Sequence, residues 1–373
     1  MTTTTTGVLA ALAGFDLMTA ARLRALLAHH APHEAYAVAA GRATAAPAVT
    51  ALRTPAIASA WRASAERRPP DVWERACVAL GVVAHAVTEP TYPIQLRHDP
   101  EPPAVVFARG DLDVLDARRV GIVGTRNATQ LGRDTARELG RALAEAGVTV
   151  VSGLAKGIDG AAHRGTLDAP AGRAVAVVGN GPDRPYPKVN SQLWAEVCAR
   201  GLLLSEWPPG TPPEPFRFPM RNRIIAALSE VLVVVESRER GGSLITAQAA
   251  IERSVEVMAV PGSVRNRAAA GTNQLLRDGV APVTDADDVL VALGLDTRRA
   301  RSVSFDPRPL PRGVEADVLA LCRQDPRTLD DVVVGAGLPM ADAAMALARL
   351  ERTGWVRECG GWFEPVVSWS GEM

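Results

Sequence analysis

Six continuous apolar runs recur along the middle of the chain, each followed by a polar or glycine-rich turn and then by a segment with helical character. Apolar runs that do not alternate with polar residues are typical of strands buried on both faces, and strands that alternate with helices build parallel sheets. The pattern therefore predicts a doubly wound α/β fold with a mostly parallel, Rossmann-like sheet of about six strands. The runs are residues 120–124, 148–153, 174–181, 202–207, 231–237 and 255–262.

The first eighty residues follow a different pattern, with short helical segments in place of apolar runs. Leucines at helical spacing follow Asp16 or Thr19, either of which can cap a helix over residues 16–30, and residues 71–80 repeat the pattern after two prolines. Prolines then break residues 82–110 into short extended pieces. We predict an N-terminal helical domain over residues 1–80 and a Rossmann-like domain over 81–295.

The last part of the chain is predicted to be a separate small domain. Residues 296–312 mix charge, serine and proline without periodicity, which indicates a linker. Three helical segments follow, the second of them opened by Thr328 and closed by glycine, and a hairpin is expected around Gly360 and Gly361. Three helices and a β-wing predict a winged helix-turn-helix over residues 313–373.

Composition and charge limit which kinds of ligand, compartment and membrane association the protein can have. The chain has 373 residues, 47% hydrophobic and 22% charged, with a formal net charge of zero, so any binding of a polyanion must come from a local concentration of charge. Four widely spaced cysteines give no zinc motif or disulfide framework, which favours a reducing compartment. The N-terminal stretch MTTTTTGVLAALAG has no basic region, and its apolar part is too short and alanine-rich for a signal peptide or membrane span. We therefore expect a cytoplasmic protein with no membrane partner.

The turns after the apolar runs carry the chemistry of an anion site. In doubly wound folds, ligands bind beyond the carboxyl ends of the strands, where helix starts offer free N–H groups. Glycine, serine and threonine let phosphates approach the backbone, and Arg126 and the only two lysines, Lys156 and Lys188, can add charge-assisted bonds. Any single glycine turn also has a purely structural explanation. Taken together, the turns predict several phosphate positions, formed by Gly124, Thr125, Arg126, Ser152, Gly153, Lys156, Lys188, Gly241, Gly242 and Ser243.

Other kinds of site are disfavoured. The first turn lacks the G-x-G-x-x-G pattern, the second strand ends in Ser152 rather than an acid, and no P-loop motif occurs, which argues against nicotinamide and ATP sites. His163 is expected to be structural. Glu206 and Glu236 end two strands, and we expect them to pair with arginines. Neither a nucleophile with its base nor a metal cluster can be assembled, so no catalytic residue, metal or cofactor is predicted.

Arg221 and Arg223 flank an asparagine just before a core strand. Because an unpaired buried guanidinium is costly, each must pair with a carboxylate or face an anion. The carboxyl-end turns lie at the same edge of the sheet as the start of this helix, so we expect one arginine to pair with Glu206 or Glu236 and the other to face the ligand.

With these residues in place, the sequence resembles the DprA/Smf family, the DNA-processing proteins of bacterial transformation. The matching segments follow one another over most of the chain, which makes the resemblance specific. They are YPIQL with DPEPPAVVFARGDL (92–112), GIVGTR (121–126), SGLAKGIDGAAH (152–163), AVVGNGPDRPYPKVN (176–190), SEWPPG (205–210), FPMRNRIIAALS (218–229), GGSLITAQAA (241–250), VPG (260–262) and GTNQLLRDG (271–279).

The resemblance implies a non-catalytic protein that binds and protects single-stranded DNA, forms a homodimer and loads the RecA recombinase in transformation or recombination. It implies a SAM-like N-terminal domain, DNA-contacting cations at Arg126 and Lys188, and Phe218 as a surface for stacking bases. By the same motif, Arg221, Asn222 and Arg223 would line that site. Binding would be sequence-independent, since glycine turns and stacking surfaces do not read base edges.

Two alternatives belong to other classes. Nucleotide phosphoribohydrolases of the lysine-decarboxylase-like group share the fold but carry a P-G-G-x-G-T signature, whereas Pro261 and Gly262 here precede Ser263. The third class is regulatory. In this alternative the winged helix-turn-helix binds duplex DNA or a protein. The helix predicted over residues 339–354 is not basic enough to bind duplex DNA, which favours a protein partner.

Overall fold

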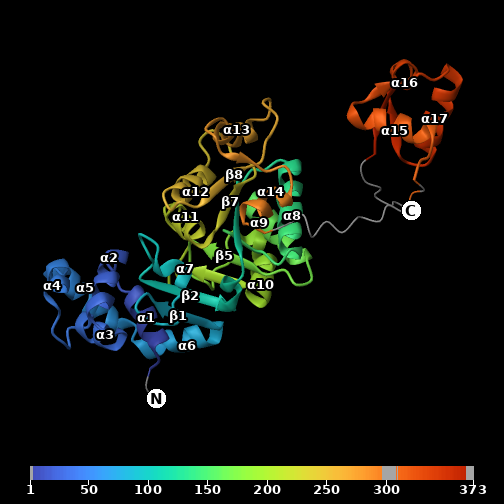
Figure 1. Ribbon diagram of the computed structural model, residues 1–373. Helices are drawn as coiled ribbons and strands as arrows, with labels where there is room; N and C mark the ends of the chain where they lie inside the picture. Colours follow the sequence, from blue (N-terminus) through green and yellow to red (C-terminus); the bar gives the residue numbers. More distant parts are fainter. Residues whose placement is uncertain (1–2, 296–307, 309, 367–373) are drawn as a thin grey trace. The chain divides into compact units, whose positions relative to one another are not determined.

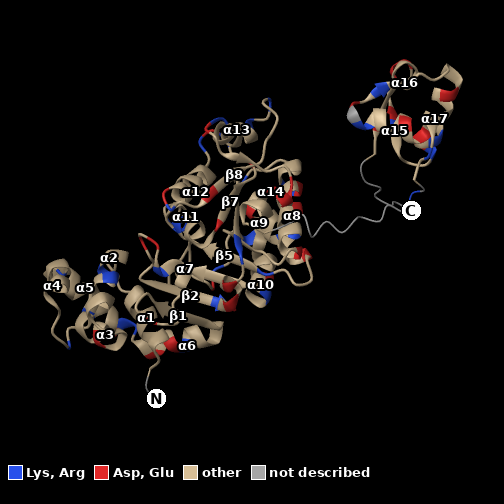
Figure 2. Ribbon diagram, viewed as in Figure 1, with Lys and Arg blue, Asp and Glu red and all other residues tan. Residues whose placement is uncertain are grey.

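The computed structural model describes residues 3–295, 308 and 310–366. The chain forms two compact units, Met1–Thr297 and Arg298–Met373, coloured blue to orange and orange to red in Figure 1. Most of the predicted linker, residues 296–312, lies outside the described residues. Basic and acidic residues are interspersed along the ribbon of both units (Figure 2), as expected for zero net charge.

The first unit is built on a nine-stranded sheet in the order β1-β2-β6-β5-β4-β3-β7-β8-β9. Neighbours from β6 to β9 are parallel, whereas β1, β2 and β6 pair antiparallel at one edge. All six predicted strands are present, which confirms the α/β fold with a large, mostly parallel sheet. The strands are Val82–Ala86, Val105–Gly110, Arg119–Val123, Thr149–Ser152, Ala174–Val178, Leu202–Ser205, Val231–Val234, Glu256–Ala259 and Ala281–Pro282 for β1 to β9.

Helices cover both faces of the sheet (Figure 1), which explains why its strands are apolar on both sides. Ile224 of α11 packs in a core on one face, while Leu139 of α8 and Ala162 of α9 pack in a core on the other. The helices of this region are α7 (Ile94–Arg97), α8 (Gln130–Glu145), α9 (Ile158–Asp168), α10 (Ser191–Arg200), α11 (Arg217–Leu228), α12 (Gly242–Ile251), α13 (Ala270–Arg277) and α14 (Ala286–Ala292).

Six short helices precede the sheet and share a core with its antiparallel edge. Leu9, Trp61 and Phe107 are fully buried together, so the side chains of the helices and of β1 and β2 form one cluster across residue 80. The Thr19 side chain accepts the first-turn N–H of Arg22, which identifies the cap of the second helix. The helices are Thr5–Ala13, Ala20–His29, Pro32–Ala39, Pro47–Leu52, Pro55–Arg67 and Pro70–Leu80 for α1 to α6.

Within its described residues, 308 and 310–366, the second unit contains three helices and a small antiparallel sheet in the order β10-β12-β11. Thr328 and Asp331 form a capping box at the start of the second helix. Gly360 and Gly361, at φ 62° and 85°, form the predicted turn of the hairpin, a backbone region that favours glycine. The elements are α15 (Val314–Gln324), β10 (Arg327–Thr328), α16 (Leu329–Ala336), α17 (Met340–Arg352), β11 (Val356–Cys359) and β12 (Trp362–Pro365).

In the part of the chain that the structure describes, no single helix has the length and apolar character to cross a membrane; the pair α16 and α17, bent by 114°, meets that test by length and composition only.

Candidate nucleic-acid interface

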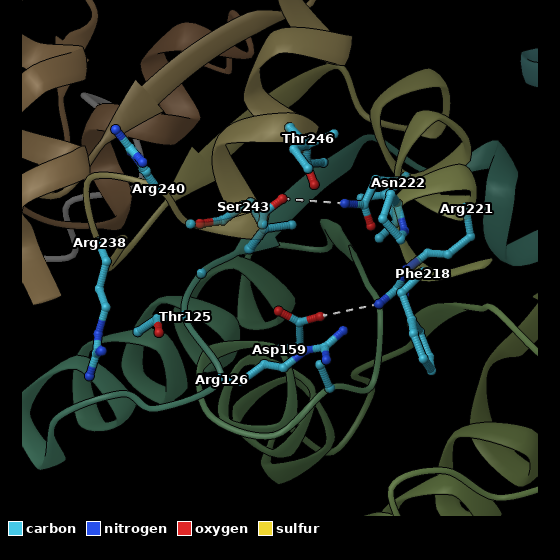
Figure 3. A pocket seen from close by; sticks show the side chains of 18 of the residues that line it. Thr125, Arg126, Asp159, Phe218, Arg221, Asn222, Arg238, Arg240, Ser243 and Thr246 are labelled. Atoms are coloured by element: carbon cyan, nitrogen blue, oxygen red, sulfur yellow. Dashed lines mark hydrogen bonds and ion pairs between the residues drawn. The ribbon is translucent and has the colours of Figure 1, made fainter. Parts of the chain in front are cut away.

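The strand order reverses between β3 and β7, and a cavity of about 440 Å³ opens there beyond the carboxyl ends of the strands (Figure 3). From β3 the chain moves outward through β4, β5 and β6 on one side, and from β7 it continues to β8 and β9 on the other. Ligands of doubly wound sheets bind at such a switch point. We call this cavity the switch-point pocket. Its walls include Gly124, Thr125, Arg126, Asp159, Phe218, Arg221, Asn222, Arg238, Arg240, Gly241, Gly242, Ser243 and Thr246.

Three helices contribute residues of their first turn, or the residues just before it, to the wall of the switch-point pocket. The residues that precede α9, α11 and α12 are Gly157, Phe216 and Gly241, and none of these three positions supplies a side-chain cap. Uncapped helix starts place N–H groups and the positive end of the helix dipole toward an anion. Gly157 has φ 80°, and a Cβ there would lie 2.3 Å from the Thr125 carbonyl oxygen, so the turn before α9 needs glycine.

Exposed cations surround the pocket. Arg126, Arg238 and Arg240 line it and, among the described residues, none of them has a carboxylate within ion-pair distance. The Arg126 guanidinium carbon lies 5.0 Å from the centre of the Phe218 ring. The mouth of the pocket is therefore positive, although the whole chain is neutral.

A smaller cavity of about 290 Å³ adjoins the first and shares Arg126, Phe218 and Arg221 with it. We call it the Lys156 cavity, since Lys156, Gly153 and Tyr186 complete much of its wall. The rings of Tyr186 and Phe218 stack with their centres 5.4 Å apart and 27° between their planes. Two aromatic rings and an arginine therefore stand where the two cavities meet.

A buried ion pair lies at the base of both cavities. Arg221 is 4% exposed, donates to the Val177 carbonyl and lies 3.9 Å from the Asp159 carboxylate, as the dashed line in Figure 3 indicates. Burial lowers the pKa of Arg221 to about 10, so it stays charged at neutral pH, and burial raises the pKa of Asp159. Arg221 therefore adds positive potential beneath the pocket from a fixed position.

Arg223 turns away from the switch-point pocket. It donates two hydrogen bonds of 2.7 Å to the carboxylate of Glu206 and one of 2.8 Å to the Glu101 carbonyl. Burial raises the pKa of Glu206, while Arg223 acts in the opposite direction. The expected pairing of one arginine with Glu206 is confirmed, and Arg221 pairs internally as well, with an aspartate that the sequence had not suggested.

The other predicted residues fall into two groups. Asn222, whose amide donates to the Gly242 carbonyl at 3.4 Å, and Ser243, which donates to the Ser237 hydroxyl at 2.9 Å, line the pocket. Ser152 is buried and donates to the Ile122 carbonyl at 2.6 Å, and Lys188 is exposed on the segment Lys188–Asn190; neither lines either cavity.

Two residues considered for other roles support the structure. The expectation that Glu236 pairs with an arginine is wrong, because its carboxylate accepts the backbone N–H and hydroxyl of Thr129 at 2.9 and 2.6 Å and so holds the start of α8. His163 is fully buried against the Val175 carbonyl, and burial lowers its pKa to about 4. Within residues 3–295, 308 and 310–366, no cluster of His, Cys, Asp or Glu could hold a metal ion.

Arg238, Arg240 and Tyr186 line the two cavities, although they were not among the predicted site residues. Their place in the sequence could have indicated this, because each follows the carboxyl end of a predicted strand. Arg238 and Arg240 follow β7, which flanks the switch point, and Tyr186 follows β5. Asp159 was missed because its role depends on a residue sixty-two positions away, Arg221.

Known proteins resemble this chain over most of the first unit. The sequence profile of a family described as DNA recombination-mediator protein A matches residues 84–294. The DNA processing protein DprA of Bacillus subtilis (strain 168) is 42% identical over 214 residues, which cover 57% of this chain and 72% of that protein.

Two solved structures resemble the fold. DprA from Streptococcus pneumoniae aligns with a TM-score of 0.63 at 30% identity, over 78% of this chain and 98% of that one. DNA processing protein A from Helicobacter pylori aligns with a TM-score of 0.52 at 27% identity, over 58% of this chain and 96% of that one. The Helicobacter structure is described as showing a single-stranded DNA binding mode.

Proposed function

Because the chain belongs to the DNA recombination-mediator protein A family, which includes the DprA and Smf proteins, we propose that it binds single-stranded DNA at the switch-point pocket and the Lys156 cavity. One observation carries the proposal: uncapped helix starts and exposed cations, which have no carboxylate partner among the described residues, converge beside an aromatic stack at the point where the strand order reverses. Supporting it, a relative with 27% identity is described as binding single-stranded DNA.

In this proposal the backbone and the bases of the strand meet different parts of the site. Phosphates lie at the starts of α11 and α12, where Arg126, Arg238 and Arg240 add charge-assisted bonds. An unstacked base lies against Phe218, whose ring already stacks with Tyr186. None of these contacts depends on the edge of a base, so the binding is sequence-independent.

The predicted site residues divide by role. Gly124, Gly153, Gly241 and Gly242 let the strand approach the backbone, and Lys156 and Lys188 extend the positive surface along the neighbouring turns. Arg221 acts from beneath through its charge, while Arg223 stabilises the fold through Glu206.

The family also suggests partners. We infer that the protein passes its strand to the RecA recombinase in transformation or recombination, and that it works in the cytoplasm as a homodimer. Two copies would bring two sites to one strand and raise the avidity without new contacts. We further propose that residues 1–80, 81–295 and 313–373 are three domains, the first two of which pack through the core that crosses residue 80.

We assign the second unit as a winged helix with a protein partner. Its third helix, α17, carries Arg349 and Arg352 against Asp342 and Glu351, and Arg349 already pairs with Glu315 at 3.1 Å. A helix with so little free positive charge is poorly suited to the phosphates of duplex DNA. A truncated chain ending at residue 307 should therefore keep its affinity for single strands.

We propose a binding role rather than catalysis. The carboxylate of Asp159 faces Arg221 and is nearly buried, so it is poorly placed to activate water or a sugar. Incubation with nucleoside monophosphates tests this directly, since release of free base would favour the phosphoribohydrolase class instead.

The central experiment measures binding of labelled oligo-dT, oligo-dA and duplex DNA by fluorescence anisotropy over a series of salt concentrations. We expect similar affinity for both single strands, weaker binding to duplex, and a loss of about 10-fold in Arg126→Ala, since a hydrogen bond to a charged group contributes about 1.5 kcal/mol. Arg42→Ala is the matched control, because Arg42 is exposed in the helical region and lines neither cavity. Equal affinity in Arg126→Ala and Arg42→Ala would contradict the site.

A further inference from the structure

A third cavity, of about 810 Å³, lies inside the first unit between the N-terminal helices and the segment that joins β6 to α11. The end of α1, the start of α2 and the end of α5 form one wall, and residues from 206 to 220 form the other. Ala104 and Val105, at the start of β2, complete it. We call this cavity the N-terminal groove.

The start of α11 separates the N-terminal groove from the switch-point pocket. Pro215 and Phe218 line the pocket, while Phe216 and Arg217 line the groove. A helix with its side chains is about 10–12 Å wide. A polymer that leaves the pocket over Phe218 therefore meets the groove after crossing a single helix.

The groove carries unbalanced positive charge. Its two acidic residues are already paired, Asp16 with Arg67 at 2.8 Å and Glu206 with Arg223 at 2.7 Å. Arg184 and Arg217 have only loose contacts of 3.6 Å, with Asp183 and Glu214, and the Arg184 side chain is 58% exposed. The groove is therefore suited to an anionic occupant.

Aromatic rings alternate with the arginines. Phe216 is 57% exposed, and the Arg217 guanidinium carbon lies 5.3 Å from the centre of its ring and 5.8 Å from that of Trp207. On the opposite wall, the Arg68 guanidinium carbon lies 3.5 Å from the centre of the Trp73 ring. Aromatic and guanidinium faces of this kind hold unstacked bases without regard to sequence.

The loop that carries Trp207 is held in place before any ligand binds. Gly210 N–H donates to the Asp183 carboxylate at 2.7 Å, and Gly181 N–H donates to the Thr211 carbonyl at 3.0 Å. A surface that is already ordered loses little conformational entropy on binding.

We propose that the N-terminal groove is a second binding site for the same DNA strand, reached across the start of α11 from the switch-point pocket. The inference rests on the proposed function, because it extends the path of a strand bound there. Phosphates pair with Arg184 and Arg68, and a base stacks on the open face of Phe216. A strand long enough to occupy both sites gains affinity that a short strand cannot.

The test compares an oligo-dT of about 6 nucleotides with one of about 20, lengths that bracket the site sizes of single-strand binding domains. Anisotropy titrations use the full chain, wild type and with Phe216→Ala and Arg184→Ala combined. Both side chains are more than half exposed, so the fold should survive, which thermal unfolding checks. Arg42→Ala is the control outside the groove.

We expect the double variant to lose about 10-fold or more in affinity for the long oligomer, from one base stack and one phosphate contact, and to bind the short oligomer like wild type. Equal losses for both lengths, or no loss for either, would overturn the proposal; the second result would leave the groove to another ligand, such as a peptide. If wild type bound neither oligomer, the proposed function itself would fail, and that result differs from a loss confined to the double variant.

Discussion

The guanidinium of Arg221 and the carboxylate of Asp159 face each other at 3.9 Å beneath the switch-point pocket, with 5% and 7% of their side chains exposed. Asp159 is the second residue of α9 and Arg221 is the fifth residue of α11, so the pair ties the N-terminal half of α11 to the start of α9. The positive charge of Arg221 strengthens the electrostatic field in the pocket. The Asp159 carboxylate, rather than a bound ligand, holds the guanidinium in this position.

Asp159→Ala should destabilise the protein more than the loss of an exposed ion pair does. It leaves the Arg221 guanidinium buried without its carboxylate, which typically costs about 3–5 kcal/mol. Asp71→Ala is the control, because Asp71 pairs with Arg75 at 2.8 Å on the surface and should cost less than about 1 kcal/mol. Denaturant unfolding measures both, and equal losses would contradict the structural role of the Asp159 pair.

Gly153→Ala should destabilise the protein through Arg221. A Cβ at Gly153 would lie 1.8 Å from the Arg221 guanidinium, which would have to move away from the Val177 carbonyl and the Asp159 carboxylate, so we expect a loss of about 1–3 kcal/mol. A double-mutant cycle with Arg221→Ala should recover part of that loss, because the clash disappears with the side chain. Additive losses would show that the guanidinium is not what excludes a side chain there.

Gly242→Ala is the counterpart of that experiment. Among the described residues, apart from its chain neighbours and the backbone of its own helix, no atom lies within 4 Å of a Cβ at Gly242, so the free energy of unfolding should stay within about 0.5 kcal/mol of wild type. Its added methyl group nevertheless lies at the start of α12, in the wall of the switch-point pocket, where we propose that phosphate binds. Gly153→Ala is thus expected to lower the free energy of unfolding, whereas Gly242→Ala leaves that free energy nearly unchanged and alters the wall of the pocket.

Stability should fall below neutral pH because of His163. Its folded pKa of about 4 lies below the ordinary 6.5, so the unfolded chain binds a proton that the folded protein excludes. The resulting stabilisation, about 3 kcal/mol from the 1.36 kcal/mol per pKa unit, is complete above pH 6.5 and is lost as the pH falls toward 4. His163→Gln should flatten the fall across this range.

The control for the pH series is His29→Gln, at an exposed position on α2. Unfolding curves measured at several pH values for wild type and both variants give the difference, in which the titration of all other groups cancels. A wild-type slope in His163→Gln would contradict the assignment of the pH dependence to this histidine.

Local pattern was enough to predict much of the fold. The six buried strands lack alternation, and Thr328 with Asp331 forms its capping box from neighbouring positions, so each could be predicted from a short segment. The two-residue strand β9 and the antiparallel pairing of β2 with β6 depend on partners far along the chain. Nothing in a window of ten residues specifies them.

The contacts of Arg221 and Arg223 show how far the sequence could predict the site. They lie two positions apart, which separates them by about 200° around a helix, so both cannot face the same surface. Sequence indicated that one should pair internally; tertiary packing decides that Arg223 meets Glu206 and that Arg221 meets Asp159. The exposed positive charge at the pocket instead belongs to Arg126, Arg238 and Arg240, which stand in the turns.

Arg238 and Arg240 should therefore carry much of the salt dependence of binding. Each contact between a cation and a phosphate contributes about 0.7 to the slope of log affinity against log salt for single strands. Replacing both by alanine should lower the slope by about 1.4 and weaken binding to oligo-dT and oligo-dA alike, because phosphate contacts carry no sequence information. Titrations at four or more salt concentrations give the slope, with Arg42→Ala as the control of equal chemistry. Weaker binding with an unchanged slope would mean that the two arginines hold the loop before α12 in place without meeting phosphate.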